Sequence, residues 1–248
     1  MSGSPPTVAL SAATLSRPRR RRRRLFRWAA ILAVVLAFPA WVGSRIGTGN
    51  FAEVEPRRVF RAGQMDAAAL ARVVRRHQIK TVLNLRGAHP EAAWYRAEVA
   101  AVVGEGATQM DVALSSREWM SRAQAATLGE ALASAERPLL IHCFNGSERT
   151  GLASAFAELL RPGGTLADAR AQFSWRYLFV SLSNGVVMLR HLEAYEGWLR
   201  AQNLDHDPER FRRWISREFR PGGPGRDDWP FDPVPLIVVT PPRKSRAK

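Results

Sequence analysis

The stretch LLIHCFNGSERTGL, residues 139–152, places an apolar run, a short loop and the beginning of a helix in direct succession. The apolar run has the length and composition of a buried strand. The loop contains Gly146 for a tight bend, so successive backbone N–H groups can point inward, and the following helix adds its positive N-terminal end. We therefore expect this loop to hold a dianion.

Cys143, the only cysteine of the chain, opens this loop. The field that binds an anion also stabilises a thiolate, which would make Cys143 a nucleophile. Arg149 can pair with two phosphoryl oxygens through its planar guanidinium, and the Thr150 hydroxyl can donate to the sulfur. A lone cysteine on an apolar strand is usually an inert buried thiol. Arg149 at this spacing favours the catalytic interpretation, and a single cysteine excludes both a disulfide framework and a cysteine-rich zinc site.

The loop resembles the His-Cys-x5-Arg-Ser/Thr signature of the cysteine-dependent protein tyrosine phosphatase superfamily, and more closely that of its compact dual-specificity branch, which has bacterial members. The matching residues are His142, Cys143, Gly146, Arg149, Thr150 and Gly151. The segments at residues 59–64, 81–87 and 192–196 also resemble this branch, so the resemblance covers roughly residues 56–200.

This resemblance implies hydrolysis of phosphate monoesters through a phosphocysteine at Cys143, without a metal or another cofactor. It also implies that His142 orients the loop and that Thr150 assists departure of the sulfur. The residues that would bind the phosphate are Phe144, Asn145, Gly146, Ser147, Glu148 and Arg149. The other histidines have no metal-ligand spacing with one another or with a pair of carboxylates, so we expect no metal site.

The general acid is a separate question. In the superfamily, an aspartate about thirty residues before the cysteine protonates the leaving oxygen and later deprotonates water. Asp111 lies 32 residues before Cys143, at the end of a predicted strand, and fits that spacing. Residues 114–119 resemble a bacterial subgroup in which this position is often not aspartate, so Glu118 and Glu148 remain alternatives. The structural alternative for Asp111 is a turn carboxylate at a strand end.

Short β-rich runs alternate with helical patterns on both sides of the loop, which is typical of an α/β domain. The predicted strands are residues 59–62, 80–85, 108–112 and 138–142. The predicted helices are residues 66–76, 91–103, 121–136, 150–160, 166–175, 184–201 and 207–219. We expect one domain over residues 51–220, with a central parallel or mixed sheet of about four to five strands flanked by helices, as in dual-specificity phosphatases.

The first 50 residues contain nine arginines and no acidic residue. We expect residues 1–24 to be a disordered basic tail and residues 25–44 to be a transmembrane signal anchor, because the apolar run is just long enough to cross a bilayer. A cleavable signal peptide is the alternative, but a clean small-x-small cleavage site is lacking. The positive-inside rule predicts a single-pass inner-membrane protein whose catalytic domain lies on the periplasmic (extracytoplasmic) side.

Lys and Arg total 37 against 22 Asp and Glu, a formal net charge of +15. Most of this excess lies in residues 1–50 and not on a face interleaved with aromatic residues, so nucleic acid is not an expected partner. The 46% hydrophobic content excludes wholesale disorder. A Pro- and Gly-rich break at residues 221–225 and a basic end predict a flexible basic C-terminal tail over residues 221–248.

Together these features predict a membrane-anchored, metal-independent tyrosine or dual-specificity protein phosphatase. Its expected partners are a phosphorylated protein or phospholipid substrate and, through the N-terminal helix, the membrane. One alternative is a lipid or inositol phosphate phosphatase, although phosphoinositide-specific relatives carry Lys where this loop has Phe144 and Ser147. A second alternative is a catalytically silent phosphate-binding module.

Overall fold

Two units make up the chain, residues 1–44 and residues 45–248. The computed structural model describes residues 17–181, 185–222 and 235–242. Helix α1, Arg17–Gly47, contains the stretch Phe26–Gly47, which is long and apolar enough to cross a membrane. The span predicted at residues 25–44 lies almost entirely within that stretch.

Helix α1 starts inside the stretch 1–24 that the sequence predicts to be a disordered tail. Arginine is a good helix former, so the basic run can extend an apolar helix. Residues 1–16 of the predicted tail lie outside the described residues.

The second unit is built on a six-stranded mixed sheet in the order β1-β2-β5-β3-β4-β6. The strands are β1 Ala52–Glu55, β2 Val59–Ala62, β3 Thr81–Asn84, β4 Thr108–Asp111, β5 Leu139–His142 and β6 Ile237–Val239. The four inner strands pair in parallel, and β1 and β6 close the two edges in antiparallel pairing. The predicted α/β fold and all four predicted strands are therefore confirmed.

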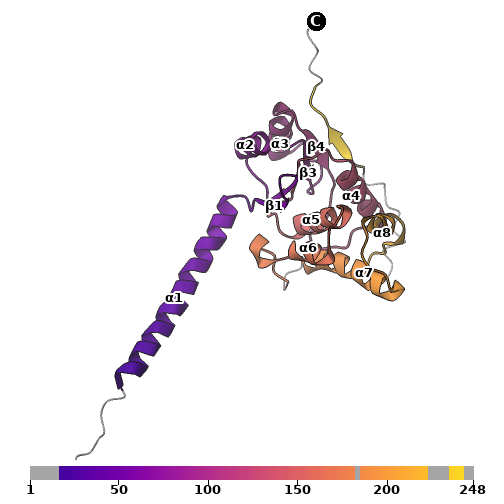
Figure 1. Cartoon of the computed structure of the whole chain (residues 1–248). Coiled ribbons are helices and arrows are strands. Elements are labelled where there is room, and N and C mark those ends of the chain that lie inside the picture. Colours follow the sequence, from indigo (N-terminus) through magenta and orange to yellow (C-terminus); the bar gives the residue numbers. More distant parts are fainter. Residues whose placement is uncertain (1–16, 182–184, 223–234, 243–248) are drawn as a thin grey trace, which may run out of the picture. The chain divides into compact units, whose positions relative to one another are not determined.

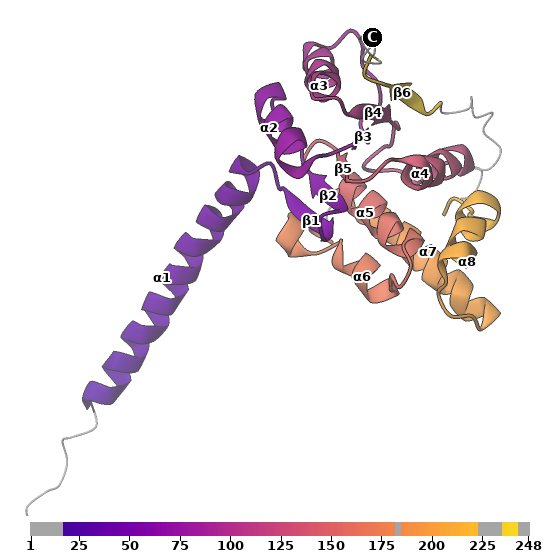
Figure 2. The ribbon, with the colours of Figure 1, turned by 45° about the horizontal axis from the view of Figure 1, so that its top comes forward.

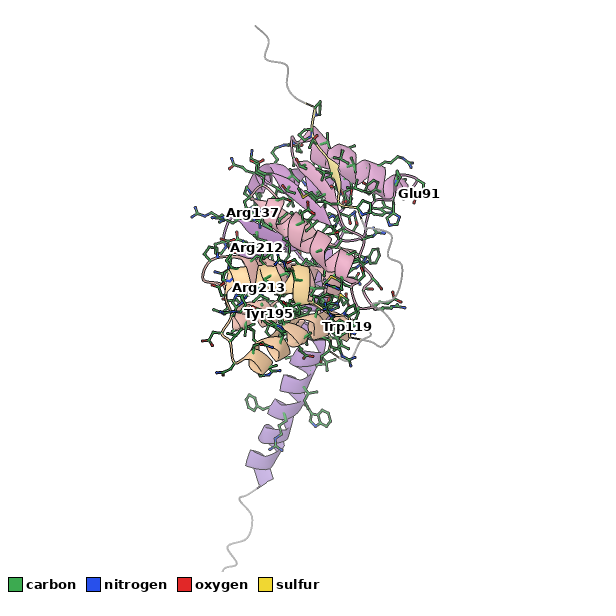
Figure 3. All side chains as sticks on the ribbon, turned by 90° about the vertical axis from the view of Figure 1, so that its right-hand side faces the viewer. Glu91, Trp119, Arg137, Tyr195, Arg212 and Arg213 are labelled. Atoms are coloured by element: carbon green, nitrogen blue, oxygen red, sulfur yellow. The ribbon has the colours of Figure 1, made fainter. Side chains whose placement is uncertain are left out.

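Helices cover both faces of the sheet (Figures 1 and 2). On one face lie α2 Ala67–His77 and α3 Ala93–Gly104; on the other lie α4 Arg122–Ser134, α5 Glu148–Leu160, α6 Leu166–Ala171 and α7 Val186–Gln202. Helix α8, Pro208–Arg213, packs against α5. Tyr195 of α7, labelled in Figure 3, meets the ring of Phe211 edge-on, with ring centroids 4.9 Å apart. The helix predicted at residues 207–219 is divided into α8 and a π-helical turn, Trp214–Glu218.

The two edge strands are the main departure from the prediction. The sequence predicts a flexible tail over residues 221–248, whereas Ile237–Val239 pair with β4. The three residues of β6 are apolar and all are β-branched, a composition that suits a strand. Strand β1 lies just before the first predicted strand and pairs with it through a short turn.

The parallel pairing brings the carboxyl ends of the inner strands to one edge of the sheet. His142 at the end of β5 is in register with Ala62 of β2 and Asn84 of β3, and Asn84 is in register with Asp111 of β4. In an open α/β sheet, ligands bind beyond this edge. The loop that begins at Cys143 therefore lies centrally, between the loops that follow β2 and β3.

Candidate active site

A cavity of about 650 Å³ opens at the carboxyl edge of the sheet, and Cys143 forms part of its wall. The loop after β3 contributes Arg86 and His89, the loop after β4 contributes Ser116 and Arg117, and the remaining wall comes from Phe144, Asn145, Glu148, Arg149 and Gly185. Cys143 is 1% exposed, so substrate can reach its sulfur only through this cavity.

The carbonyl groups of the loop are turned away from the cavity because each finds a donor behind the loop. The backbone N–H of Gln64, which follows β2, donates to the carbonyl of Phe144 at 2.9 Å. The side-chain Nδ2 of Asn50 donates to the carbonyl of Asn145 at 3.1 Å.

The next two carbonyls are held in the same way. The carbonyl of Gly146 accepts from Asn50 Nδ2 at 3.1 Å and from Arg61 Nη2 at 2.9 Å. The carbonyl of Ser147 accepts from the backbone N–H of Gly151 at 2.7 Å. In a planar trans peptide, the carbonyl and the next N–H point in opposite directions. The N–H groups of residues 145–148 therefore face the cavity, in the arrangement of an anion cradle.

Arg61 supports this cradle from inside the core, where its side chain is completely buried. Its Nη1 donates to the backbone and side-chain oxygens of Gln172 at 2.9 and 3.0 Å, and its guanidinium lies 3.8 Å above the Tyr177 ring. Burial lowers the pKa of Arg61 to about 10, so it stays a cation at neutral pH.

Gly146 is required at the bend by its surroundings as well as by its φ of +68°. A Cβ atom there would lie 2.5 Å from the backbone nitrogen of Gly63 and 2.6 Å from the carbonyl carbon of Ala62. The loop thus lies directly against the end of β2, where any side chain would push it into the cavity.

Arg149 lies in the first turn of α5, where it lines the cavity beside Cys143. Its Nη1 donates to the carbonyls of Leu114 at 3.2 Å and Leu85 at 3.4 Å, which come from the loops after β4 and β3. Its Nε is buried without a hydrogen-bond partner among the described residues. The guanidinium is thus aimed by two carbonyls while one donor stays available for an oxyanion.

Behind the loop, His142 faces a buried carboxylate. Its Nε2 lies 3.2 Å from Glu98 Oε1, without the alignment of a hydrogen bond. Burial alone would raise the pKa of Glu98, but the charge of His142 and hydrogen bonds from Gln109 and Gln64 lower it. Glu98 is thus a carboxylate that can hold the imidazole in place next to Cys143.

Thr150 is buried at the start of α5, and its hydroxyl donates to the carbonyl of Ala62 at 3.4 Å. The predicted donation to the sulfur of Cys143 is therefore not the bond it makes here. Ser147 is the N-cap of α5 but makes no side-chain cap, and its Oγ is buried without a partner among the described residues.

Asp111, the acid favoured by spacing, lies at the end of β4 and is 1% exposed. Its carboxylate accepts from Tyr95 Oη at 2.6 Å, from Asn84 Nδ2 at 2.8 Å and from Gln109 Nε2 at 3.1 Å. Burial raises its pKa, although these hydrogen bonds oppose the shift. A raised pKa suits a proton donor, but Asp111 is not part of the cavity wall.

The two alternative acids differ in position. Glu148 is half-buried, lies in the first turn of α5 and lines the cavity with Cys143. Glu118 is exposed and does not line the cavity. Glu148 is thus the carboxylate placed beside the nucleophile in the described part of the chain.

A second arginine reaches the cavity from outside the loop. The guanidinium of Arg86 lies 3.6 Å above the Trp94 ring and 5.3 Å from the Phe144 ring, and its Nη1 donates to Gln64 Oε1 at 2.9 Å. Burial, and then the charge of Arg149, lower its pKa. These three contacts are with neutral groups, so the charge of Arg86 is available to a ligand.

Sequence reasoning singled out the loop but missed its supports, namely Asn50, Arg61, Arg86 and Glu98. A signal existed for Arg61, which is a charge in a four-residue strand of otherwise apolar residues. Glu98 is likewise the one acidic residue of the mostly apolar helix α3. Asn50 lies before the stretch covered by the family resemblance, and nothing in its local pattern marks it.

Comparison with known proteins matches residues 44–161 to the model of a family described as the tyrosine phosphatase family. No curated protein matches the sequence significantly. Among solved structures, TpbA from P. aeruginosa is similar at 17% identity, with 69% of this chain and 93% of that chain covered and a TM-score of 0.49.

Two further solved structures are similar over a somewhat shorter part of this chain. The catalytic domain of the PP-IP phosphatase SIW14 from S. cerevisiae, in complex with citrate, is 18% identical, with 62% of this chain and 92% of that chain covered and a TM-score of 0.45. PTPMT1 in complex with PI(5)P is 12% identical, with 62% of this chain and 98% of that chain covered and a TM-score of 0.44.

Proposed function

Because this chain belongs to the cysteine-dependent protein tyrosine phosphatase superfamily and is a hydrolase of that type, we propose that it dephosphorylates tyrosine or dual-specificity protein substrates through a phosphocysteine at Cys143. The observation that carries the proposal is the anion cradle. Its backbone N–H groups, the aimed guanidinium of Arg149 and the sulfur of Cys143 converge on one cavity.

The proposed reaction has two steps. The Cys143 thiolate attacks phosphorus, the bond to the ester oxygen breaks, and a carboxylic acid gives that oxygen its proton. The same carboxylate then takes a proton from water, whose oxygen attacks phosphorus and releases the thiolate and inorganic phosphate. The cradle and Arg149 stabilise the charge on the equatorial oxygens in both steps.

An aryl phosphate substrate is supported by the rim of the cavity. Phe144 follows the nucleophile, lines the cavity and is 59% exposed, so its ring is accessible to a ligand there. The aromatic ring of a phosphotyrosine could lie against it while its phosphate occupies the cradle.

A second candidate substrate class is a lipid or inositol phosphate with another anionic group near the scissile phosphate. Arg86 and Arg117 favour it, because both line the cavity in addition to Arg149. Within the loop itself, residues 143–149, Arg149 is the one cation, and the fold adds the other two from the loops after β3 and β4.

Anchoring is part of the same proposal. Helix α1 is long and apolar enough to cross a membrane, and we propose that it holds the phosphatase at the inner membrane. An anchored domain would meet phosphoproteins and lipid headgroups at the membrane surface.

The test is a metal-free activity screen of the full chain in detergent, with a chelator present. Its substrates are phosphotyrosine peptides, phosphoinositides, phosphatidylglycerol phosphate and nucleotides. We expect turnover of phosphotyrosine peptides; preferred turnover of a lipid phosphate would instead establish the second candidate.

The Cys143→Ser variant is the control for the mechanism. It should lose turnover while it still binds inorganic phosphate, because the cradle and Arg149 are unchanged. Turnover retained by this variant, or turnover that requires an added divalent metal, contradicts the phosphocysteine mechanism. Phosphate binding by the wild-type chain without turnover of any substrate would indicate a silent binding module.

A further inference from the structure

Asn50 is buried behind the catalytic loop, although it stands only three residues after the end of α1. Its Nδ2 lies 3.1 Å from the carbonyl oxygens of Asn145 and Gly146 and 3.0 Å from that of Tyr177. Its Oδ1 accepts a hydrogen bond from Arg45 Nη2 at 2.9 Å. The side chain is 2% exposed, so these bonds are not shared with solvent.

The two loop contacts decide the direction of two peptide units. When the carbonyls of Asn145 and Gly146 point back to Asn50, the N–H groups of Gly146 and Ser147 must point into the cavity. Arg61 also donates to the Gly146 carbonyl. For the Asn145 carbonyl, Asn50 is the donor found in the described part of the chain.

The backbone beside Asn50 contacts the end of β2 and the loop. The carbonyl of Gly49 accepts from the N–H of Gly63 at 2.6 Å, and a Cβ at Gly63 would lie 3.0 Å from the carbonyl carbon of Asn145. Asn50 itself has a φ of +52°, a left-handed conformation that asparagine adopts more readily than most residues. The chain segment, the end of β2 and the loop are thus in direct contact.

We propose that Asn50, oriented by Arg45, is a positioning residue for the anion cradle. The short segment Arg45–Asn50, at the C-terminal end of α1, then helps to position the catalytic loop. An effect of Asn50 on turnover rests on the proposed function. An effect of Asn50 on anion binding does not, because binding needs no turnover.

The test uses full-length chains that carry Cys143→Ser, in which binding of inorganic phosphate is measured by calorimetry. Asn50→Asp keeps the shape but replaces the donor by an anion that faces three carbonyl oxygens. Asn50→Ala removes the donor without adding charge. We expect both to weaken phosphate binding by about tenfold or more, the equivalent of one or two lost hydrogen bonds.

Asn203 offers a matched control, since it is an exposed asparagine at the end of α7 with a nearly identical φ of +51°. Asn203→Asp should leave phosphate binding unchanged. Arg45→Gln should weaken it less than the Asn50 variants, because Asn50 keeps its own donors.

Thermal unfolding separates positioning from a merely structural role. If the Asn50 variants are folded at the assay temperature and bind phosphate as the Cys143→Ser parent does, the inference is wrong. If both Asn50 variants are unfolded, the Arg45→Gln variant provides the test. Unchanged phosphate binding by folded Arg45→Gln protein then overturns the inference.

The same measurements keep the two proposals apart. A wild-type chain that turns over no substrate refutes the proposed function, yet loss of phosphate binding in the Asn50 variants would still uphold the positioning role. Active wild-type protein together with Asn50 variants of unchanged phosphate affinity would uphold the proposed function and refute the positioning role.

Discussion

Glu148 and Asp111 are the two candidates for the proton donor. Asp111 has the pKa that suits the role, and Glu148 has the position. Asp111 has the raised pKa of a donor but is held by Tyr95, Asn84 and Gln109 away from the cavity wall. Glu148 lies on that wall. A general acid must come within hydrogen-bond reach of the leaving oxygen, so geometry takes precedence over pKa.

We therefore predict that Glu148→Gln lowers kcat about 100-fold for phosphotyrosine or phosphoserine but much less for an aryl phosphate with a good leaving group. The reason is that a weakly basic phenolate leaves without protonation. Steady-state kinetics with a series of leaving groups measures this dependence.

The controls are Asp111→Asn and Glu118→Gln. Asp111→Asn should affect all leaving groups alike, since it disturbs a buried hydrogen-bond network behind the cavity. A steep leaving-group dependence in Asp111→Asn, with none in Glu148→Gln, would return the role to Asp111, and the roles proposed for Cys143 and Arg149 would be unaffected.

At this scale, a sequence can predict a site where the residues concerned are close neighbours along the chain. Cys143 and Arg149 are six residues apart in one loop, so their spacing alone carries the chemistry. Asn50 contacts Asn145 from 95 residues away, and Glu98 contacts His142 from 44 residues away. The local sequence around these residues does not specify such partners, because the contacts form only when the sheet folds.

Among the elements, the loop after β4 is held at its end by a hydrogen bond to a buried histidine of α7, His191. The backbone N–H of Met120 donates to His191 Nε2 at 2.9 Å, while His191 Nδ1 lies 2.8 Å from the carbonyl of Val187 in α7. Nδ1 thus carries the proton and Nε2 accepts, which requires a neutral ring. Trp119 packs on that ring, with centroids 4.4 Å apart (Figure 3).

Burial lowers the pKa of His191 to about 4, and this predicts acid sensitivity. The unfolded chain takes up this proton near its ordinary pKa of about 6.5, so between these values it binds more protons than the native state. Acidification from about pH 6.5 to about pH 4 should therefore remove up to about 3 kcal/mol of stability through His191.

Urea unfolding of the full chain at pH 7 and pH 4.5 measures this loss. His191→Gln should reduce the difference between the two pH values, because glutamine can accept from Met120 without titrating. His89→Gln, whose ring is about half exposed, should retain it. Equal pH dependence in wild type and His191→Gln would refute the assignment.

The elements that were predicted correctly share a strong internal pattern. Ser121 has the residue type and position of an N-cap, and α4 begins there with a full capping box. Strands β2, β3 and β5 are largely apolar and buried throughout, which makes them recognisable. Strand β6 was missed because a three-residue edge strand is stabilised by its partner β4, and its own sequence lies within a Pro-containing basic stretch.

On the scale of the whole molecule, charge and hydropathy are divided along the chain. All acidic residues follow residue 50, and nine arginines precede it. The structure divides the chain into two units, residues 1–44 and residues 45–248. A change of composition along the chain can be recognised without knowledge of tertiary contacts.

This division predicts the membrane orientation. The arginine-rich start of α1 should remain in the cytoplasm, because positively charged flanks are retained on that side, and residues after 47 should then be translocated. A reporter joined after residue 50 tests the orientation: an alkaline-phosphatase fusion should be active and a cytoplasm-dependent fluorescent reporter inactive.

Replacing Arg19, Arg20, Arg21, Arg22, Arg23 and Arg24 by glutamine provides the matched control, since it removes the charge and keeps the apolar stretch. This variant should lose its uniform orientation, so that both reporters give partial signals. An inactive alkaline-phosphatase fusion together with an active cytoplasmic reporter in the wild-type chain would place Cys143 in the cytoplasm. Intracellular phosphoproteins would then become the protein substrates to test first, because extracytoplasmic proteins could not reach the cradle.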